Sequence, residues 1–199
     1  MLWFLIQFLL DGDCQDVIDV IFEPRKRHDH TAAIVDDKLY ILGGSGYGGD
    51  HEFFYLNVSS LVDTQTLIWY DLSSHNTVPS RYGAAAVESG ADNNTLVVYD
   101  SSTALIYTFN SQKREWIIKQ ISENNIVGKQ FLTVINIEER MYIFVPDTNE
   151  PQMILMNVNL DSQGVGKIIN APSGLADYSA TLLPDKTIIY IGKNSCNFV

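Results

Sequence analysis

The residue types best suited to chemistry lie in one stretch near the N-terminal part of the chain. His28 and His30 are two residues apart, so in an extended segment the two imidazoles share a face and could bind a metal ion. The alternative is structural, with Arg27 and His30 holding the entry to a first strand by hydrogen bonds. His51 and His75 stand alone in predicted loops. Neither histidine forms a recognisable sequence motif with a nucleophile, so we expect a surface role for both.

A glycine-rich segment at residues 44–49 matches the pattern G-x-G-x-x-G of dinucleotide-binding sites. Such a site also needs a helix that begins at the glycines, because the N–H groups of its first turn bind the pyrophosphate. The segment here is followed by Phe53-Phe54-Tyr55, which is typical of a strand. We therefore predict a flexible loop without a bound nucleotide.

Composition narrows the functional classes. The chain has 199 residues, and 13 Lys and Arg against 24 Asp and Glu give a formal net charge of −11. This charge argues against a nucleic-acid binder, because phosphate contacts need a basic surface. Hydrophobic residues make up 46% of the chain, which excludes intrinsic disorder and allows a real core. Cys14 and Cys196 are too few for a disulfide scaffold and lack zinc-ligand spacing. Taking the histidines and the glycine-rich segment together with these cysteines, we expect no metal and no cofactor.

Residues 1–22 are set apart as an N-terminal apolar segment and linker. Residues 1–10 form an apolar run of signal-peptide core length, too short to span a bilayer. No Lys or Arg precedes this run and no small-x-small cleavage site follows it, so the alternatives are a buried first strand or an artefact of where the chain begins. We expect a secreted or cell-surface protein if the run is a signal peptide, and a cytoplasmic one otherwise. No stretch of about eighteen apolar residues predicts a transmembrane helix.

The rest of the chain is predicted to be all-β. Short runs of β-branched and aromatic residues alternate with turn signals about every eight to twelve residues, and we find no convincing helical periodicity. The predicted strands, besides the repeated motif described next, are residues 31–35, 53–58, 67–72, 84–87, 105–109, 115–118, 131–137, 153–158 and 179–183.

One hydrophobic strand motif recurs along the chain at a similar spacing. Leu39-Tyr40-Ile41-Leu42 aligns with segments that begin at Leu96, Met141 and Ile188, at offsets of 57, 45 and 47 residues. A predicted strand precedes each copy, and further strands follow where the chain continues. The sequence therefore holds about three and a half units of four strands.

The first unit resembles a kelch repeat. The resemblance rests on residue types in the kelch order, namely Pro24, Arg27, His30, Tyr40, Gly43-Gly44 and Trp69. The second unit has Arg81-Tyr82-Gly83 and Trp116, but Asp100-Ser101 stands in place of the diglycine. The third has Val145-Pro146 there, and the fourth breaks off after Gly192-Lys193. The resemblance covers roughly residues 23–193.

This resemblance implies an all-β, kelch-type β-propeller that is incomplete or open, with about 3.5 four-stranded antiparallel blades. The expected units are residues 23–79, 80–128 and 129–174, a partial unit at 175–193 and a C-terminal tail at 194–199. Structural roles are expected at the repeat positions Arg27, His30, Tyr40, Gly43, Gly44, Trp69, Arg81, Gly83, Trp116, Tyr142, Tyr190 and Gly192. The glycines allow sharp turns, and the tryptophans fill space between blades.

The number of units leaves blade faces without a neighbour. Propellers close with about four to eight blades, and closure hides the outermost faces. We therefore expect the chain to be a fragment of a longer propeller, or to complete one with another copy.

The resemblance also implies a non-catalytic protein-interaction module that binds a partner through blade-edge loops. The candidate contact residues in those loops are Tyr47, His51, Glu52, His75 and Asp92. The acidic balance favours a basic or neutral protein partner, of unknown identity. The alternative is a secreted carbohydrate-active or copper-dependent oxidase related to galactose oxidase, whose propeller is also built from kelch units. No catalytic residue of that enzyme finds a matching motif here, so none is predicted.

Overall fold

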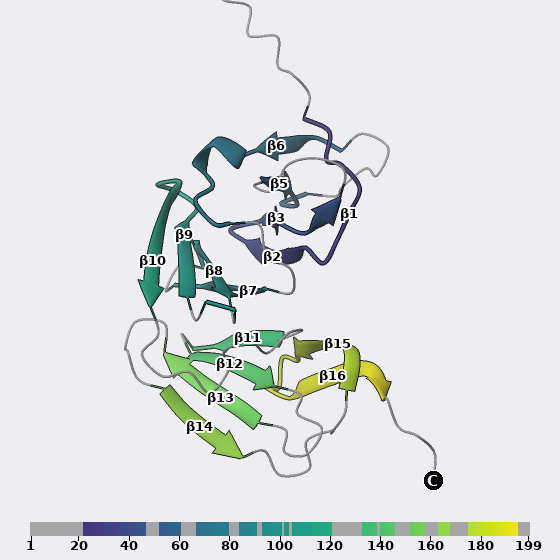
Figure 1. Ribbon diagram of the computed structural model, residues 1–199, viewed down its shortest axis with the longest axis vertical. Coiled ribbons are helices and arrows are strands. Elements are labelled where there is room, and N and C mark those ends of the chain that lie inside the picture. Colours follow the sequence, from purple (N-terminus) through teal and green to yellow (C-terminus); the bar gives the residue numbers. More distant parts are fainter. Residues whose placement is uncertain are drawn as a thin grey trace, which may run out of the picture.

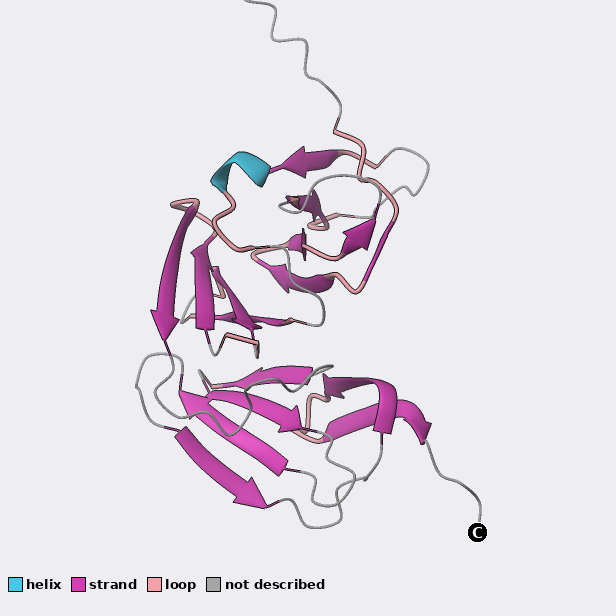
Figure 2. Ribbon diagram, in the orientation of Figure 1, coloured by secondary structure: helices cyan, strands magenta, loops and turns pink. Residues whose placement is uncertain are grey.

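The computed structural model describes twelve segments of the chain, and these segments are almost entirely strands and turns (Figure 1, Figure 2). The described residues are 22–46, 52–60, 67–79, 84–90, 93–100, 102–103, 105–120, 133–138, 140–145, 152–157, 163–167 and 175–194. The one helical element within them is the 3₁₀ helix η2 (Ser73–His75). The all-β prediction is therefore confirmed for this part of the chain.

The first sheet is an antiparallel meander of four strands in the order β2-β3-β5-β6. These strands are β2 (Thr31–Val35), β3 (Lys38–Leu42), β5 (Phe53–Asn57) and β6 (Trp69–Asp71). A two-stranded ribbon lies beside it, formed by β1 (Arg27–His28) and β4 (Ser45–Gly46). Part of the predicted glycine loop is thus paired strand. The helix that a dinucleotide site needs is absent from the described residues here, because β5 follows.

The second and third sheets repeat the four-stranded meander. The second sheet has the order β7-β8-β9-β10, with β7 (Ala85–Ser89), β8 (Thr95–Asp100), β9 (Leu105–Asn110) and β10 (Glu115–Gln120). The third has the order β11-β12-β13-β14, with β11 (Thr133–Ile137), β12 (Arg140–Val145), β13 (Gln152–Asn157) and β14 (Gln163–Lys167). A fourth, two-stranded sheet pairs β15 (Leu175–Leu182) with β16 (Ile188–Asn194).

Most predicted strands exist, with bounds that differ by a few residues. The last strand of the first sheet is shorter than the predicted 67–72, and β15 begins earlier than the predicted 179. The strand β14 was missed entirely. Its sequence, Gln-Gly-Val-Gly-Lys, holds two glycines, which weaken any strand signal.

The four sheets follow one another along an arc. The first strands of successive sheets lie against each other in chain order, β2 on β7, β7 on β11 and β11 on β15. The outermost strands β6, β10 and β14 lie on the outside of the arc (Figure 1). The described sheets do not form a closed ring.

One hydrophobic core lies between the first and second sheets. Its buried residues are Val35, Tyr40, Leu42, Phe53, Leu72, Val78, Leu96, Val98, Tyr107 and Phe109. The rings of Phe53 and Phe109 meet edge to face at a centroid distance of 4.9 Å, and the ring of Trp116 lies 4.9 Å from that of Phe109. Trp116 therefore fills space between two sheets, as its repeat position predicts. Such edge-to-face pairs add to the free energy gained by burial alone.

A second core lies between the second and third sheets. It contains Ala85, Val97, Tyr99, Ile106, Val134, Met141 and Ile143. β8 of the second sheet is thus buried on both faces, because neighbours in this strand alternate between the two cores. This explains why β8 reads as a continuous apolar run rather than an alternating one.

Trp69 differs from the expected packing between two blades. Its indole lies 5.4 Å from the ring of Phe54, on the face of the first sheet that points away from the second sheet. Phe22 forms an isolated bridge with Trp69 and packs 5.2 Å from the same Phe54 ring. A segment before the first strand, rather than another described sheet, therefore covers this tryptophan.

Candidate functional site

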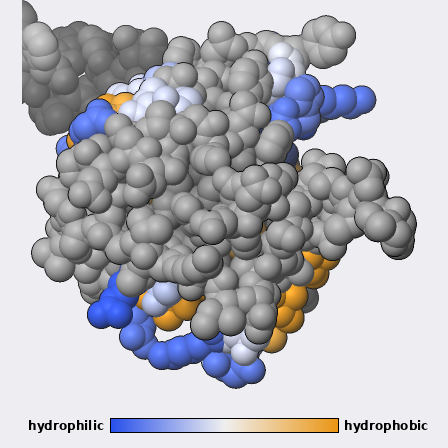
Figure 3. Space-filling view, turned by 60° about the horizontal axis from the view of Figure 1, so that its bottom comes forward, coloured by the Kyte–Doolittle hydropathy of each residue, from blue (hydrophilic) through white to orange (hydrophobic). Residues whose placement is uncertain are grey.

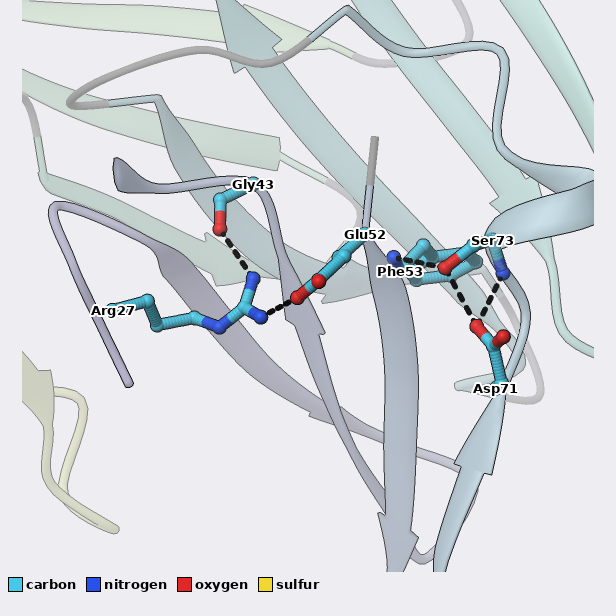
Figure 4. Close-up of polar contacts among 6 residues, drawn as sticks. All are labelled: Arg27, Gly43, Glu52, Phe53, Asp71 and Ser73. Carbon is cyan, nitrogen blue, oxygen red and sulfur yellow. Dashed lines mark hydrogen bonds and ion pairs between the residues drawn. The ribbon is translucent and has the colours of Figure 1, made fainter. Parts of the chain in front are cut away.

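Arg27 joins the entry of the first sheet to the loop that follows β3. Its Nη1 donates a hydrogen bond of 2.9 Å to the carbonyl oxygen of Gly43, and its Nη2 forms an ion pair with a carboxylate oxygen of Glu52 (Figure 4). The guanidinium also lies 4.7 Å from the centre of the Phe54 ring, a favourable cation–π distance. Both charged side chains are largely buried, at 10% and 16% exposure. Burial lowers the pKa of Arg27 from its ordinary value.

The glycines at this position are required by the backbone. Gly43 and Gly44 have φ of 65° and 88°, in the left-handed region that side chains disfavour. A Cβ on Gly44 would also lie 2.7 Å from the carbonyl oxygen of His28 and 2.9 Å from the backbone nitrogen of His30. The diglycine therefore lets the chain pass close to the segment that enters β2.

A second set of polar contacts closes the same end of the sheet. The backbone N–H of Phe53 donates to the Oγ of Ser73 at 3.2 Å, and the Ser73 hydroxyl donates to Asp71 Oδ1 at 2.6 Å (Figure 4). The backbone N–H of Ser73 donates to the same oxygen at 2.8 Å. Sequence reasoning did not select Asp71 and Ser73. Their Asp-x-Ser spacing, which suits a side-chain-to-backbone turn, is the signal that could have found them.

In the second sheet, the turn that corresponds to the diglycine contains a buried carboxylate. Asp100, which aligns with Gly43, is buried at the end of β8. Its Oδ1 accepts hydrogen bonds from the backbone N–H and the hydroxyl of Ser102 at 2.9 and 2.6 Å, and its Oδ2 accepts one from the Thr103 hydroxyl at 2.8 Å. The polar replacement of the diglycine is therefore a fully bonded turn.

The two histidines do not lie in one extended segment. Asp29 between them has φ of 55°, which interrupts the strand that the shared-face argument requires. The exposed ring of His28 pairs with Asp29 through an Nδ1–Oδ2 contact of 2.8 Å. Partial desolvation and the charge of Arg27 lower the pKa of His30. Within the described segments, no group of three or more His, Cys, Asp or Glu residues could hold a metal ion.

The remaining sequence candidates fall into two groups. His75 is exposed in η2, Tyr40 is buried between the first two sheets, and Tyr142 is half-buried in β12. For Tyr190 and Gly192 the structure gives only strand positions in β16. The candidates that lie outside the described residues are Tyr47, His51, Arg81, Gly83 and Asp92.

The structure thus brings together Arg27, Gly43 and Glu52 and leaves an exposed rim beside them. Lys26, His28, Ser45 and Gly46 line a shallow, open depression at the β1–β4 ribbon. The charges of Arg27 and Glu52 neutralise each other, so these two residues hold the loop in place and offer little chemistry of their own. The rim can contact another molecule, and within it His28 lies opposite Ser45 across the ribbon.

In the described part of the chain, no helix is long and apolar enough to cross a bilayer. Neither a scan against protein-family models nor a search of curated proteins finds a match for this chain.

Proposed function

We propose that the chain forms an incomplete or open kelch-type β-propeller that acts as a non-catalytic protein-interaction module. The observation that carries the proposal is the succession of antiparallel meanders whose first strands lie against one another in chain order. This arrangement fits propeller blades around an axis, where strands form the frame and loops are free to bind. The kelch-like residue types of the first unit add to it.

The contact surface in this proposal is the loop end of the first sheet. The Arg27–Glu52 pair and the Asp71–Ser73 turn hold that end, while His28 and His75 are exposed there. The net charge of −11 favours a basic or neutral protein partner. Rigid support under exposed side chains lowers the entropy lost on binding.

The test is affinity capture with variants at the two ends of the sheets. The variants His28→Lys and His75→Lys add a positive charge to the loop end, and Gln112→Lys adds the same charge to an exposed turn at the opposite end. We expect a captured protein whose binding falls at least about tenfold in the first two variants and stays unchanged in the third. Equal loss in all three variants, or binding that none of them alters, would contradict a contact at this end.

A further inference from the structure

Neighbouring sheets in this chain pack on each other with the same faces and in the same strand register. Each sheet has a forward face, which packs on the next sheet along the chain, and a backward face, which packs on the previous one. In the first sheet the forward face carries Tyr40 and Leu42, and they share a core with Leu96 and Val98 on the backward face of the second sheet. Alternate residues of a strand point to opposite faces. Val97 and Tyr99 therefore lie on the forward face of the second sheet, which packs on the third sheet.

The second interface follows this rule. Val97 and Tyr99 on the forward face of the second sheet share a core with Met141 and Ile143 on the backward face of the third. The strand pairing preserves the register, because Thr31 lies opposite Leu42 in the first sheet as Thr133 lies opposite Phe144 in the third. Forward face on backward face is thus the repeated contact of this molecule.

The fourth sheet has a forward face that no described sheet covers. Ser179 lies opposite Ile191, the same relation as Thr31 and Leu42, so Ile189 and Ile191 occupy the forward positions. Their side chains are 38% and 70% exposed. Hydrophobic surface of the described residues reaches the outside of the molecule at the lower right of Figure 3.

The first sheet has the complementary face open. Ile34 lies opposite Leu39 on its backward face and is 54% exposed. The outer half of this face is covered, because Phe22 and Arg27 both pack on Phe54. The open part therefore lies over β2, where Ala32 and Ile34 are exposed, and reaches the half-buried Leu39 of β3, whereas Ile41 of β3 is buried. The fourth sheet offers two described strands, β15 and β16.

We propose that the forward face of the fourth sheet binds the backward face of the first sheet of a second copy of this chain. The contact repeats the forward-on-backward packing already present twice inside the chain, and it buries Ile189 and Ile191 against Ile34 and Leu39. Burial of apolar side chains supplies the free energy. The two faces differ, so the interface is heterologous, and each copy offers one face of each kind. This surface is separate from the loop end proposed for partner binding.

Sedimentation velocity over a range of concentrations tests the proposal with three single variants. Ile191→Lys disables the forward face and Ile34→Lys disables the backward face, and both positions are exposed in the single chain, so circular dichroism should show unchanged strand content. The matched control is Ile117→Lys, which changes an isoleucine of 68% exposure on the outermost strand of the second sheet. The wild type and this control should associate equally.

Sedimentation of a mixture of Ile34→Lys and Ile191→Lys is the decisive measurement. Each variant alone should sediment as a monomer, because its one intact face has no intact counterpart. An equimolar mixture should form a dimer, since the forward face of Ile34→Lys meets the backward face of Ile191→Lys. A monomeric wild type at all concentrations overturns the proposal. Association of either variant alone, or no association in the mixture, also overturns it.

Discussion

At the scale of single residues, the turn after the second strand is built differently in the first and second sheets. After β3 the chain turns through Gly43 and Gly44, with positive φ and the guanidinium of Arg27 bonded to the Gly43 carbonyl. After β8 the aligned position holds Asp100, whose carboxylate accepts the hydrogen bonds of its own turn. The glycine role could be predicted from the sequence, whereas the buried aspartate could not, because its partners are neighbours that many exposed loops also contain.

His30 provides a test at this scale. The pKa of its imidazole is lowered in the folded chain by desolvation and by Arg27, so the unfolded chain binds the proton more readily. The free energy of unfolding should therefore fall as pH drops through about 6.5, the ordinary histidine value, and level off below the folded-state pKa. Urea unfolding between about pH 7.5 and 5.5 measures this loss.

His30→Gln should weaken the pH dependence in that range. His75→Gln changes an exposed histidine in η2 and leaves His30 in place, so the dependence should persist in this control. An NMR titration that finds a His30 pKa above 6.5 would show that the assigned environment is wrong.

At the scale of elements, the strands that sequence reasoning found are those with a dense apolar signal. β3 and β8 are continuous β-branched and aromatic runs, and their bounds in the structure fall within one residue of the predicted runs. β14 was missed because its glycines remove side chains that would mark a strand. Face assignment was harder than strand assignment. Trp69 and Trp116 read alike in the sequence, yet only Trp116 lies between two described sheets.

The core between the first two sheets gives a prediction at this scale. Phe109 is fully buried among aromatic rings, so Phe109→Ala should lower the free energy of unfolding by about 3–5 kcal/mol through lost burial and a cavity. Ile118→Ala, at an exposed position of the adjacent strand β10, should change it by less than about 0.5 kcal/mol. Urea denaturation measures both. Similar values for the two variants would mean that the core does not lie between these sheets.

At the scale of the whole molecule, the repeat spacing anticipated the succession of four-stranded antiparallel meanders. The offsets of 57, 45 and 47 residues locate one sheet each, because a sheet of four short strands with turns needs about fifty residues. How the sheets stack could not be predicted in the same way, since it depends on which alternate residues point to which neighbour. In the structure the sheets lie along an arc, and β8 of the second sheet is buried on both faces (Figure 1).

The most direct test of this stacking of sheets is a set of methyl nuclear Overhauser effects from the adjacent residues Val97 and Val98. We expect Val98 to show contacts to first-sheet residues such as Leu42, and Val97 to show contacts to third-sheet residues such as Ile143. Contacts from both valines to one and the same sheet, or exposure of either methyl pair to water, would contradict the stacked arrangement of sheets.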